Sequence, residues 1–192
     1  IAEGDKLVGD TLTLFKCRLL VATPEWLQVH NTSSCNEVIE ATHDEIAKAS
    51  LMQSPQNVIA VYEMLQNAIS PDELKGKLLL ALDCIQDPGN LGTIVRSSVA
   101  FGIDTIVLSN NSVDLYNDKV IRSSEGMLFY VNVVREDLVS VINELKNKDY
   151  KVYGTSVTNG DSVSSLSRTK KFALVMGNEG AGVKQNIVDI CD

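Results

Sequence analysis

Three polar segments, each beside a run of apolar residues, carry the side chains that could do chemistry. The first, residues 83–96, follows an apolar run and opens a predicted helix, with Pro88 in the turn and Asn90 as the expected cap. Apolar residues at helical spacing form one stripe of this helix, which leaves Arg96 on another face, within reach of a ligand at the end of the preceding strand. The alternative is an ordinary capped turn followed by a surface arginine.

The second segment, residues 122–126, is a polar cluster in which Arg122 and Ser124 could contact a phosphate or a ribose, and a solvated loop is the alternative.

In the third segment, residues 174–183, an apolar run leads into three glycines with Glu179 among them. Glycine lets a ligand approach backbone amides closely. The order of these glycines differs from the dinucleotide-binding fingerprint, and no Walker lysine follows, so a simple turn stays open as an alternative.

The elements that must position these segments alternate between strand and helix. Residues 78–83 form a continuous apolar strand, as expected where helices cover both faces of a sheet. The alternation predicts an α/β fold with a mainly parallel sheet and helices on both faces. Ligands bind such sheets at the carboxyl ends of the strands, where the three segments are expected to fall. The expected strands are 78–83, 104–108, 129–134, 150–155 and 171–176, and the expected helices are 90–101, 116–124, 136–148 and 184–191.

A smaller α/β domain is predicted ahead of this one, over residues 1–68. Residues 69–77 carry glycine, proline and charge and are expected to be a linker, which gives residues 78–192 to the second domain. In the first domain the expected helices are 3–15, a short one capped by Thr23, and 43–52, and the expected strands are 17–22, 37–42 and 56–62.

Together the three segments resemble the signatures of the SpoU/TrmH family of RNA 2′-O-ribose methyltransferases, in the SPOUT superfamily. Residues 87–96, followed by 100–102, are similar to the first signature of that family. Residues 123–126 are similar to its short Ser-x-Gly segment, and residues 174–182 to its second signature. All three occur in the family's order and spacing, which is more specific than any one of them. The front domain resembles, more loosely, the L30e-like RNA substrate-binding domain found ahead of many such enzymes.

The resemblance implies S-adenosyl-L-methionine as the cofactor, a C-terminal trefoil knot when the domain is complete, and a homodimer whose active sites borrow from the partner. Asn90 and Arg96 would lie at the reacting ribose, with Glu179 supporting the site. We expect Arg96 to stabilise the developing alkoxide or an adjacent phosphate, because a guanidinium holds its proton tightly; action as a base is the alternative. The cofactor-binding residues implied are Met176, Gly177, Asn178, Gly180 and Gly182.

The net charge of −8 counts against a chain wrapped in nucleic acid, so any RNA contact must be focused on local cations. Lys16 and Arg18 in the front domain, and Arg122 and Ser124 behind, are the expected RNA-binding residues. Ribosomal RNA is the favoured substrate and transfer RNA the alternative. Three other functions stay open: a non-catalytic RNA-binding relative, a knotted methyltransferase acting on a base nitrogen, and an unrelated nucleotide-binding α/β enzyme.

The remaining composition indicates a cytoplasmic protein without a metal or a membrane span. The four cysteines and two histidines match no metal-ligand spacing. No apolar run is long enough to cross a membrane, and the first residues lack a signal sequence. The family's third signature, a Ser-Leu-Asn stretch that completes the cofactor pocket, does not occur in these 192 residues, so the catalytic domain is expected to be C-terminally incomplete.

Overall fold

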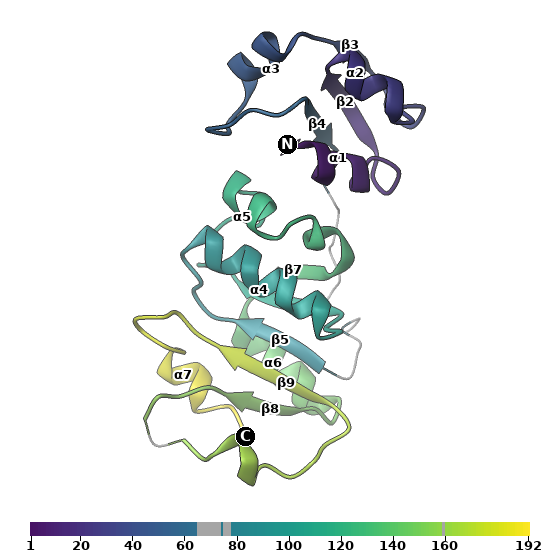
Figure 1. The fold of residues 1–192 in the computed structure, drawn as a ribbon. Coiled ribbons are helices and arrows are strands. Elements are labelled where there is room, and N and C mark those ends of the chain that lie inside the picture. Colours follow the sequence, from purple (N-terminus) through teal and green to yellow (C-terminus); the bar gives the residue numbers. More distant parts are fainter. Residues whose placement is uncertain (65–73, 75–77, 159) are drawn as a thin grey trace. The chain divides into compact units, whose positions relative to one another are not determined.

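The computed structural model describes residues 1–64, 74, 78–158 and 160–192, in two compact units (Figure 1). The first unit is Ile1–Gln66 and the second is Asn67–Asp192, whereas the sequence-based prediction ends the first domain at residue 68. Of the predicted linker, residues 69–77, all but Leu74 lie outside the described residues.

The first unit is built on a four-stranded mixed sheet with the strand order β1-β4-β2-β3. Strand β2 runs parallel to β3, and β4 runs antiparallel to both β1 and β2. This unit thus alternates helices and strands, with one short strand, β1, more than the sequence predicts. Its elements are β1 (Ala2–Glu3), α1 (Asp5–Thr11), β2 (Cys17–Ala22), α2 (Pro24–Val29), β3 (Val38–Glu40), α3 (His43–Ala49) and β4 (Val58–Tyr62).

Side-chain caps set the starts of two helices in this unit. The Thr23 hydroxyl accepts the N–H of Trp26 at 3.4 Å, as predicted, and Thr42 forms a reciprocal capping box with Glu45 at the start of α3. The predicted helix over residues 3–15 is too long, because Glu3 pairs with β4 in the sheet and α1 begins only at Asp5. The predicted helix over residues 43–52 is also too long, since α3 ends at Ala49.

The second unit contains a five-stranded sheet in which every strand pair is parallel, with the order β7-β6-β5-β9-β8. This confirms the predicted fold class. Its elements are β5 (Leu78–Leu82), α4 (Pro88–Ala100), β6 (Thr105–Ser109), α5 (Asp118–Ser123), the 3-10 helix η2 (Met127–Tyr130), β7 (Asn132–Glu136), α6 (Leu138–Asn147), β8 (Lys151–Gly154), the 3-10 helix η3 (Val163–Ser165), β9 (Phe172–Met176) and α7 (Gln185–Val188).

Helices cover both faces of this sheet, which explains the apolar character of its central strands. Leu79 and Ala81 of β5 share one core cluster with Val141 of α6 and Ile187 of α7. Because side chains alternate across a strand, Leu80 and Leu82 face the opposite side, where α4 lies (Figure 1). The order of these strands places the carboxyl ends of β5 and β9 next to each other.

Three sequence-based boundaries in this unit are wrong. Asp87, and not Asn90, caps α4: its carboxylate accepts the Asn90 N–H at 2.9 Å, and Pro88 takes the first helical position. The strand expected over residues 129–134 begins only at Asn132, because residues 127–130 form a 3-10 helix. The last helix covers residues 185–188 rather than 184–191.

Candidate active site

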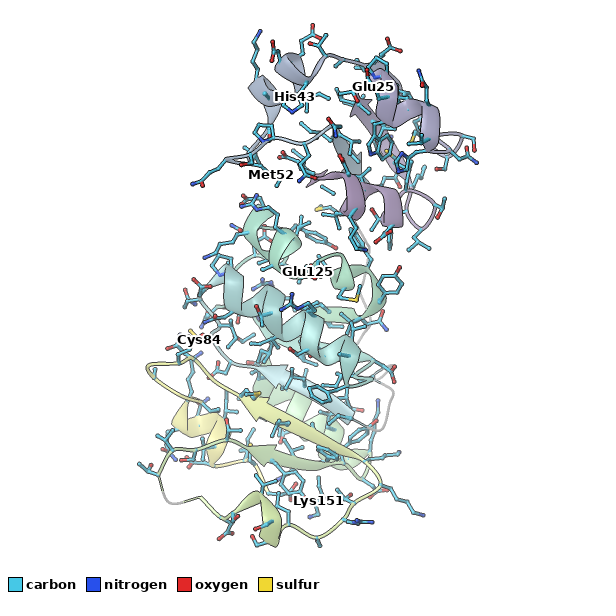
Figure 2. The ribbon with its side chains drawn as sticks, viewed as in Figure 1. Glu25, His43, Met52, Cys84, Glu125 and Lys151 are labelled. Atoms are coloured by element: carbon cyan, nitrogen blue, oxygen red, sulfur yellow. The ribbon has the colours of Figure 1, made fainter. Side chains whose placement is uncertain are left out.

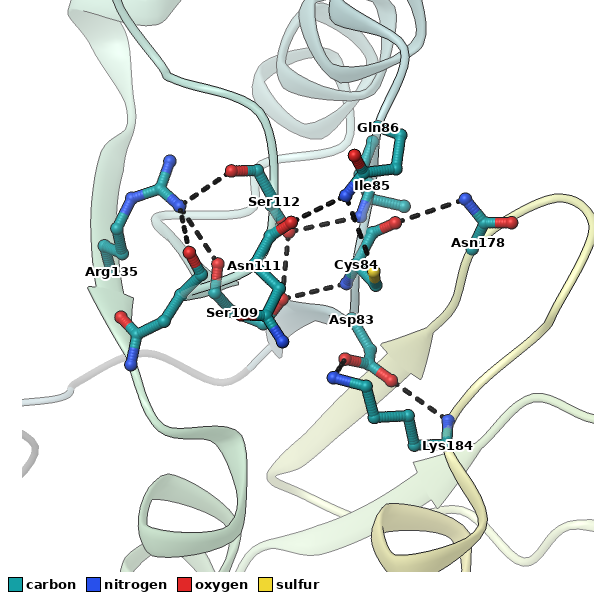
Figure 3. Close-up of polar contacts among 11 residues, drawn as sticks. Asp83, Cys84, Ile85, Gln86, Ser109, Asn111, Ser112, Arg135, Asn178 and Lys184 are labelled. Atoms are coloured by element: carbon teal, nitrogen blue, oxygen red, sulfur yellow. Dashed lines mark hydrogen bonds and ion pairs between the residues drawn. The ribbon is translucent and has the colours of Figure 1, made fainter.

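The first and third polar segments meet at the carboxyl edge of the sheet. Strands β5 and β9 pair along their whole length, so the loops that follow them start side by side. The Asp83 N–H donates to the Met176 carbonyl at 2.8 Å, and the Asn178 amide donates to the Cys84 carbonyl at 3.2 Å (Figure 3). Residues 93 and 94 positions apart in the chain are thus held in one polar site.

Asn178 shapes the glycine-containing turn of the third segment. Its side-chain oxygen accepts the N–H groups of Gly180 at 2.8 Å and Ala181 at 3.1 Å, while its backbone N–H and carbonyl both bond to Gly182. A Cβ on Gly177 would lie 2.1 Å from the Gly182 carbonyl carbon, so only glycine fits there. The segment is therefore a compact turn whose backbone approaches itself closely.

Asn90, Glu179 and Arg96 are all exposed, and two of them are in contact. The Asn90 amide donates to the Glu179 carboxylate across the gap between the two loops. Arg96, on the same helix as Asn90, forms an ion pair with Glu125, which follows α5. The structure thus joins Asn90 to Glu179 directly, while the partner of Arg96 comes from the second segment.

The carboxylate of Asp87, which caps α4, is stabilised in its charged form. The backbone N–H of Asn90 lowers the pKa of Asp87, and Lys119, whose ammonium lies 3.4 Å away, lowers it further. Asp87 therefore stays ionised through the neutral pH range and fixes the first turn of α4.

The second segment packs α5 against α4. Ser123 donates to the Lys119 carbonyl at 2.6 Å and lies 3.3 Å from the Pro88 carbonyl of α4. Arg122 pairs within its own helix with Asp118, at 2.7 Å. Ser124 is fully buried and its hydroxyl donates to the Ile121 carbonyl at 2.9 Å, so this side chain supports the turn and does not face a ligand.

Lys16 and Arg18 belong to the first unit and share one carboxylate. Their cationic groups lie 2.9 Å and 2.6 Å from Glu63. Both partners, Lys16 first, lower the pKa of Glu63, which keeps this cluster ionised. Lys16 and Arg18 are each more than half exposed, so they form a small positively charged patch on the first unit, which otherwise carries more acidic than basic residues.

Sequence reasoning missed the residues that hold the carboxyl edge together. The Arg135 guanidinium donates to the carbonyl of Ser109, at the end of β6, and to three carbonyls of the loop that follows, at 2.7–3.2 Å. Figure 3 shows Arg135 with Ser109 and Ser112. The hydroxyls of these two serines accept the N–H groups of Cys84 at 2.8 Å and Ile85 at 3.1 Å. The position of Ser109 at the end of a buried strand is a signal that could have found it, whereas Arg135 carries none.

Two non-glycine residues at this site have positive φ. Cys84 has φ 58° and Glu125 has φ 49°; both are labelled in Figure 2. The left-handed region is unfavourable for residues with a Cβ and persists only where neighbours hold it. Cys84 lies in the first polar segment and Glu125 in the second, while Asp149, outside all three segments, has φ 63° as well.

A polar pocket of about 240 Å³ opens at the same edge, between the ends of β5, β6 and β7 and the start of α7. The residues lining the pocket include Asp83, Ser109, Asn110, Glu136, Asp137 and Lys184.

Among the described residues, no three His, Cys, Asp or Glu side chains gather in a way that could hold a metal ion. None of the helices in the described part of the chain is long and apolar enough to cross a membrane.

The fold and the site define a parallel α/β protein with a strained, glycine-containing site at the carboxyl edge of its sheet. Residues 77–192 match the model of the SpoU rRNA methylase family, and the chain belongs to that family. This confirms the resemblance drawn from the three segments.

Individual relatives agree with this assignment. Over 151 residues the chain is 36% identical to the Bacillus subtilis 23S rRNA (guanosine(2553)-2′-O)-methyltransferase RlmP, which covers 79% of this chain and 59% of the relative. The structure of AdoMet-bound rRNA methyltransferase from Sinorhizobium meliloti is similar over 99% of this chain and 74% of its own, with a TM-score of 0.84 and 28% identity. A TrmH-family structure from Porphyromonas gingivalis matches 100% of this chain and 76% of its own, with a TM-score of 0.81 and 29% identity. The chain therefore spans little more than half the length of the curated relative.

Proposed function

We propose that the protein is an S-adenosyl-L-methionine-dependent RNA methyltransferase that modifies a ribose 2′-hydroxyl, with ribosomal RNA as the substrate. The observation that carries this proposal is the contact between Asn90 and Glu179. Asn90 lies on α4, which also bears Arg96, and Glu179 lies 89 positions later in the chain, in the glycine-containing turn. The exposed guanidinium of Arg96 can stabilise a hydroxyl oxygen that gains negative charge during reaction, and the Glu179 carboxylate can accept a hydrogen bond from that hydroxyl. The activity named for RlmP and the cofactor named for the Sinorhizobium structure support the same conclusion.

The glycine-containing turn suits an adenosyl cofactor. S-adenosyl-L-methionine, when bound, supplies a methyl group already activated by its sulfonium, so the protein has to provide placement and electrostatics. The backbone of residues 177–182 can approach such a ligand without obstruction from Cβ atoms at Gly180 and Gly182. Met176, 39% exposed at the end of β9, adds an apolar surface beside the turn.

Glu179 and Arg96 act on the ribose. One carboxylate oxygen of Glu179 accepts the Asn90 amide, which orients the carboxylate and leaves its second oxygen to accept a hydrogen bond from the ribose hydroxyl. Arg96 keeps its proton, so it stabilises charge on the reacting oxygen or anchors the neighbouring phosphate. Because Arg96 is paired with Glu125 here, an RNA phosphate competes with that carboxylate.

The remaining features of the functional protein follow from the family. We propose that Arg122, Lys16 and Arg18 contact the RNA backbone, and that the first unit is the L30e-like substrate-binding domain. A knotted catalytic domain, a homodimer and a cytoplasmic location are proposed with it.

Transfer of labelled methyl groups to isolated ribosomal and transfer RNA tests this function, using protein of full natural length. Incorporation into ribosomal RNA, lost in Glu179→Gln, is the expected result. Incorporation into transfer RNA alone would move the substrate to that class. Absence of label in both, from a folded protein that still binds RNA, would favour a non-catalytic RNA-binding protein.

A further inference from the structure

Asp83, the first residue after β5, is a buried carboxylate whose partners all lie on one distant segment. Its side chain is 0% exposed, and burial of a carboxylate is unfavourable unless charge and hydrogen bonds compensate it. One oxygen accepts the backbone N–H of Lys184 at 3.0 Å, and the other lies 3.3 Å from the Lys184 ammonium (Figure 3). The Asp83 N–H donates to the Met176 carbonyl at 2.8 Å.

These contacts fix both ends of the glycine-containing turn. Met176 immediately precedes residues 177–183 and Lys184 immediately follows them, so one residue joins the entry and the exit of this segment. The backbone of Asp83 holds the entry, and its side chain holds the exit. A carboxylate is suited to this task, because a single group can accept an amide hydrogen and pair with an ammonium at once.

The next residue completes the attachment. The Cys84 carbonyl accepts the Asn178 amide in the middle of the same segment, and the Cys84 N–H donates to Ser109. Cys84 adopts its positive φ between these two side chains, as expected where surrounding contacts over-determine a strained backbone. Residues 83–84 thus bind the turn at its entry, Met176, in its middle, Asn178, and at its exit, Lys184.

We propose that Asp83 is a positioning residue that sets the geometry of the cofactor-binding turn, and this inference rests on the proposed function. Asp83 touches neither cofactor nor ribose; it acts through Lys184 and Met176 on the backbone of residues 177–183. Displacement of a binding backbone by about 1 Å can cost up to a hundredfold in function. The effect is expected on S-adenosyl-L-methionine and not on RNA, because the contacts of Asp83 end at the turn.

The test compares Asp83→Asn with Ile142→Val, in protein of full natural length. Asp83→Asn keeps the shape of the side chain and removes the charge that pairs with Lys184. Ile142 of α6 is fully buried in the core of the same unit and lies outside the candidate site, so loss of one methylene lowers stability without touching the turn. Lys184→Met serves as a second variant, because it removes the ammonium while the backbone N–H of residue 184 still reaches Asp83.

Kinetics separate positioning from stability. Asp83→Asn is expected to raise the KM for S-adenosyl-L-methionine by about tenfold or more, with kcat and the KM for RNA changed less than about threefold. Lys184→Met is expected to raise the same KM by a smaller factor. Ile142→Val is expected to lower Tm and leave the KM unchanged. An unchanged cofactor KM in both Asp83→Asn and Lys184→Met would overturn the inference.

Hydrogen exchange of residues 177–184 without any cofactor gives a readout independent of activity. Faster exchange in Asp83→Asn than in Ile142→Val, confined to this segment, is the expected result. Equal protection in the two variants would overturn the positioning role even if the enzyme assay failed. If wild-type protein neither binds the cofactor nor transfers methyl groups while the exchange difference is present, the proposed function fails and the structural role of Asp83 stands.

Discussion

Replacing Gly92 by alanine should separate α4 from α5. Gly92 lies in the middle of α4, and a Cβ built on it would lie 2.0 Å from the Ser123 hydroxyl oxygen and 2.7 Å from the Val120 carbonyl oxygen. The serine can rotate away only by giving up its bond to the Lys119 carbonyl. The Val120 carbonyl belongs to the backbone of α5, so that helix must move.

The magnitude follows from two opposing effects. Overpacking of this kind costs about 1–3 kcal/mol, and about 2–3 kcal/mol is expected here because the Val120 carbonyl cannot rotate away. Replacement of a helical glycine by alanine returns up to about 1 kcal/mol, so a net loss of about 1–2 kcal/mol is expected. Urea unfolding followed by circular dichroism measures this loss as a lower transition midpoint with an unchanged slope. Methyl transfer should also fall, because Arg96 on α4 and Glu125 after α5 lie across the same helix pair.

Two further variants isolate the cause. Ser97→Ala, at an exposed position of α4, changes helix propensity alone and should leave stability equal or slightly raised. Gly92→Ala combined with Ser123→Ala removes the 2.0 Å contact but not the 2.7 Å contact with the carbonyl, so it should recover only part of the loss. A Gly92→Ala protein as stable as Ser97→Ala would refute this account of the helix contact.

Three more predictions concern the site itself. Arg96→Ala should abolish methyl transfer while calorimetry shows an almost unchanged affinity for S-adenosyl-L-methionine; lost cofactor affinity would argue against its assignment to the ribose. Gly177→Ala should abolish cofactor binding in the same assay, because its Cβ would lie 2.1 Å from the backbone of Gly182, and normal binding would show that the turn adapts. Since the N–H of Asn90 lowers the pKa of Asp87, that carboxylate stabilises the fold above its unfolded pKa, and the contribution is lost as the pH falls through its folded pKa. The difference in stability between wild type and Asp87→Asn, measured by urea unfolding, should therefore shrink from pH 7 towards acid, and a difference independent of pH would contradict this cause.

Much of the fold could be predicted because its central strands are buried on both faces. Strand β5 reads as an unbroken apolar run, and its predicted range differs from the observed one by a single residue. The apolar run over residues 129–134 looks equally strand-like, yet residues 129 and 130 belong to the 3-10 helix η2. That helix begins directly after Gly126, whose φ of 82° reverses the chain. Periodicity could not detect that turn, because the apolar residues on either side of it have the same character.

The candidate site was predictable where chemistry and spacing coincide, and not where tertiary contacts decide. Asn90 and Glu179 could be selected from their motifs, but their contact depends on the pairing of β5 with β9. The cap was assigned one helical turn too late, because Pro88 at the first helical position makes the preceding Asp87 the cap. The roles of Asp83 and Arg135 depend on backbone groups of other loops, which no local pattern specifies.

The most direct test of the central claim is the chemical position of the transferred methyl group. RNA methylated by the full-length protein is hydrolysed with alkali, which cannot cleave the phosphodiester next to a methylated 2′-oxygen, and the labelled products are resolved by mass spectrometry. The account predicts that the label remains in alkali-resistant dinucleotides from ribosomal RNA and is absent with Arg96→Ala. Label released in mononucleotides, and therefore carried on a base, would contradict it.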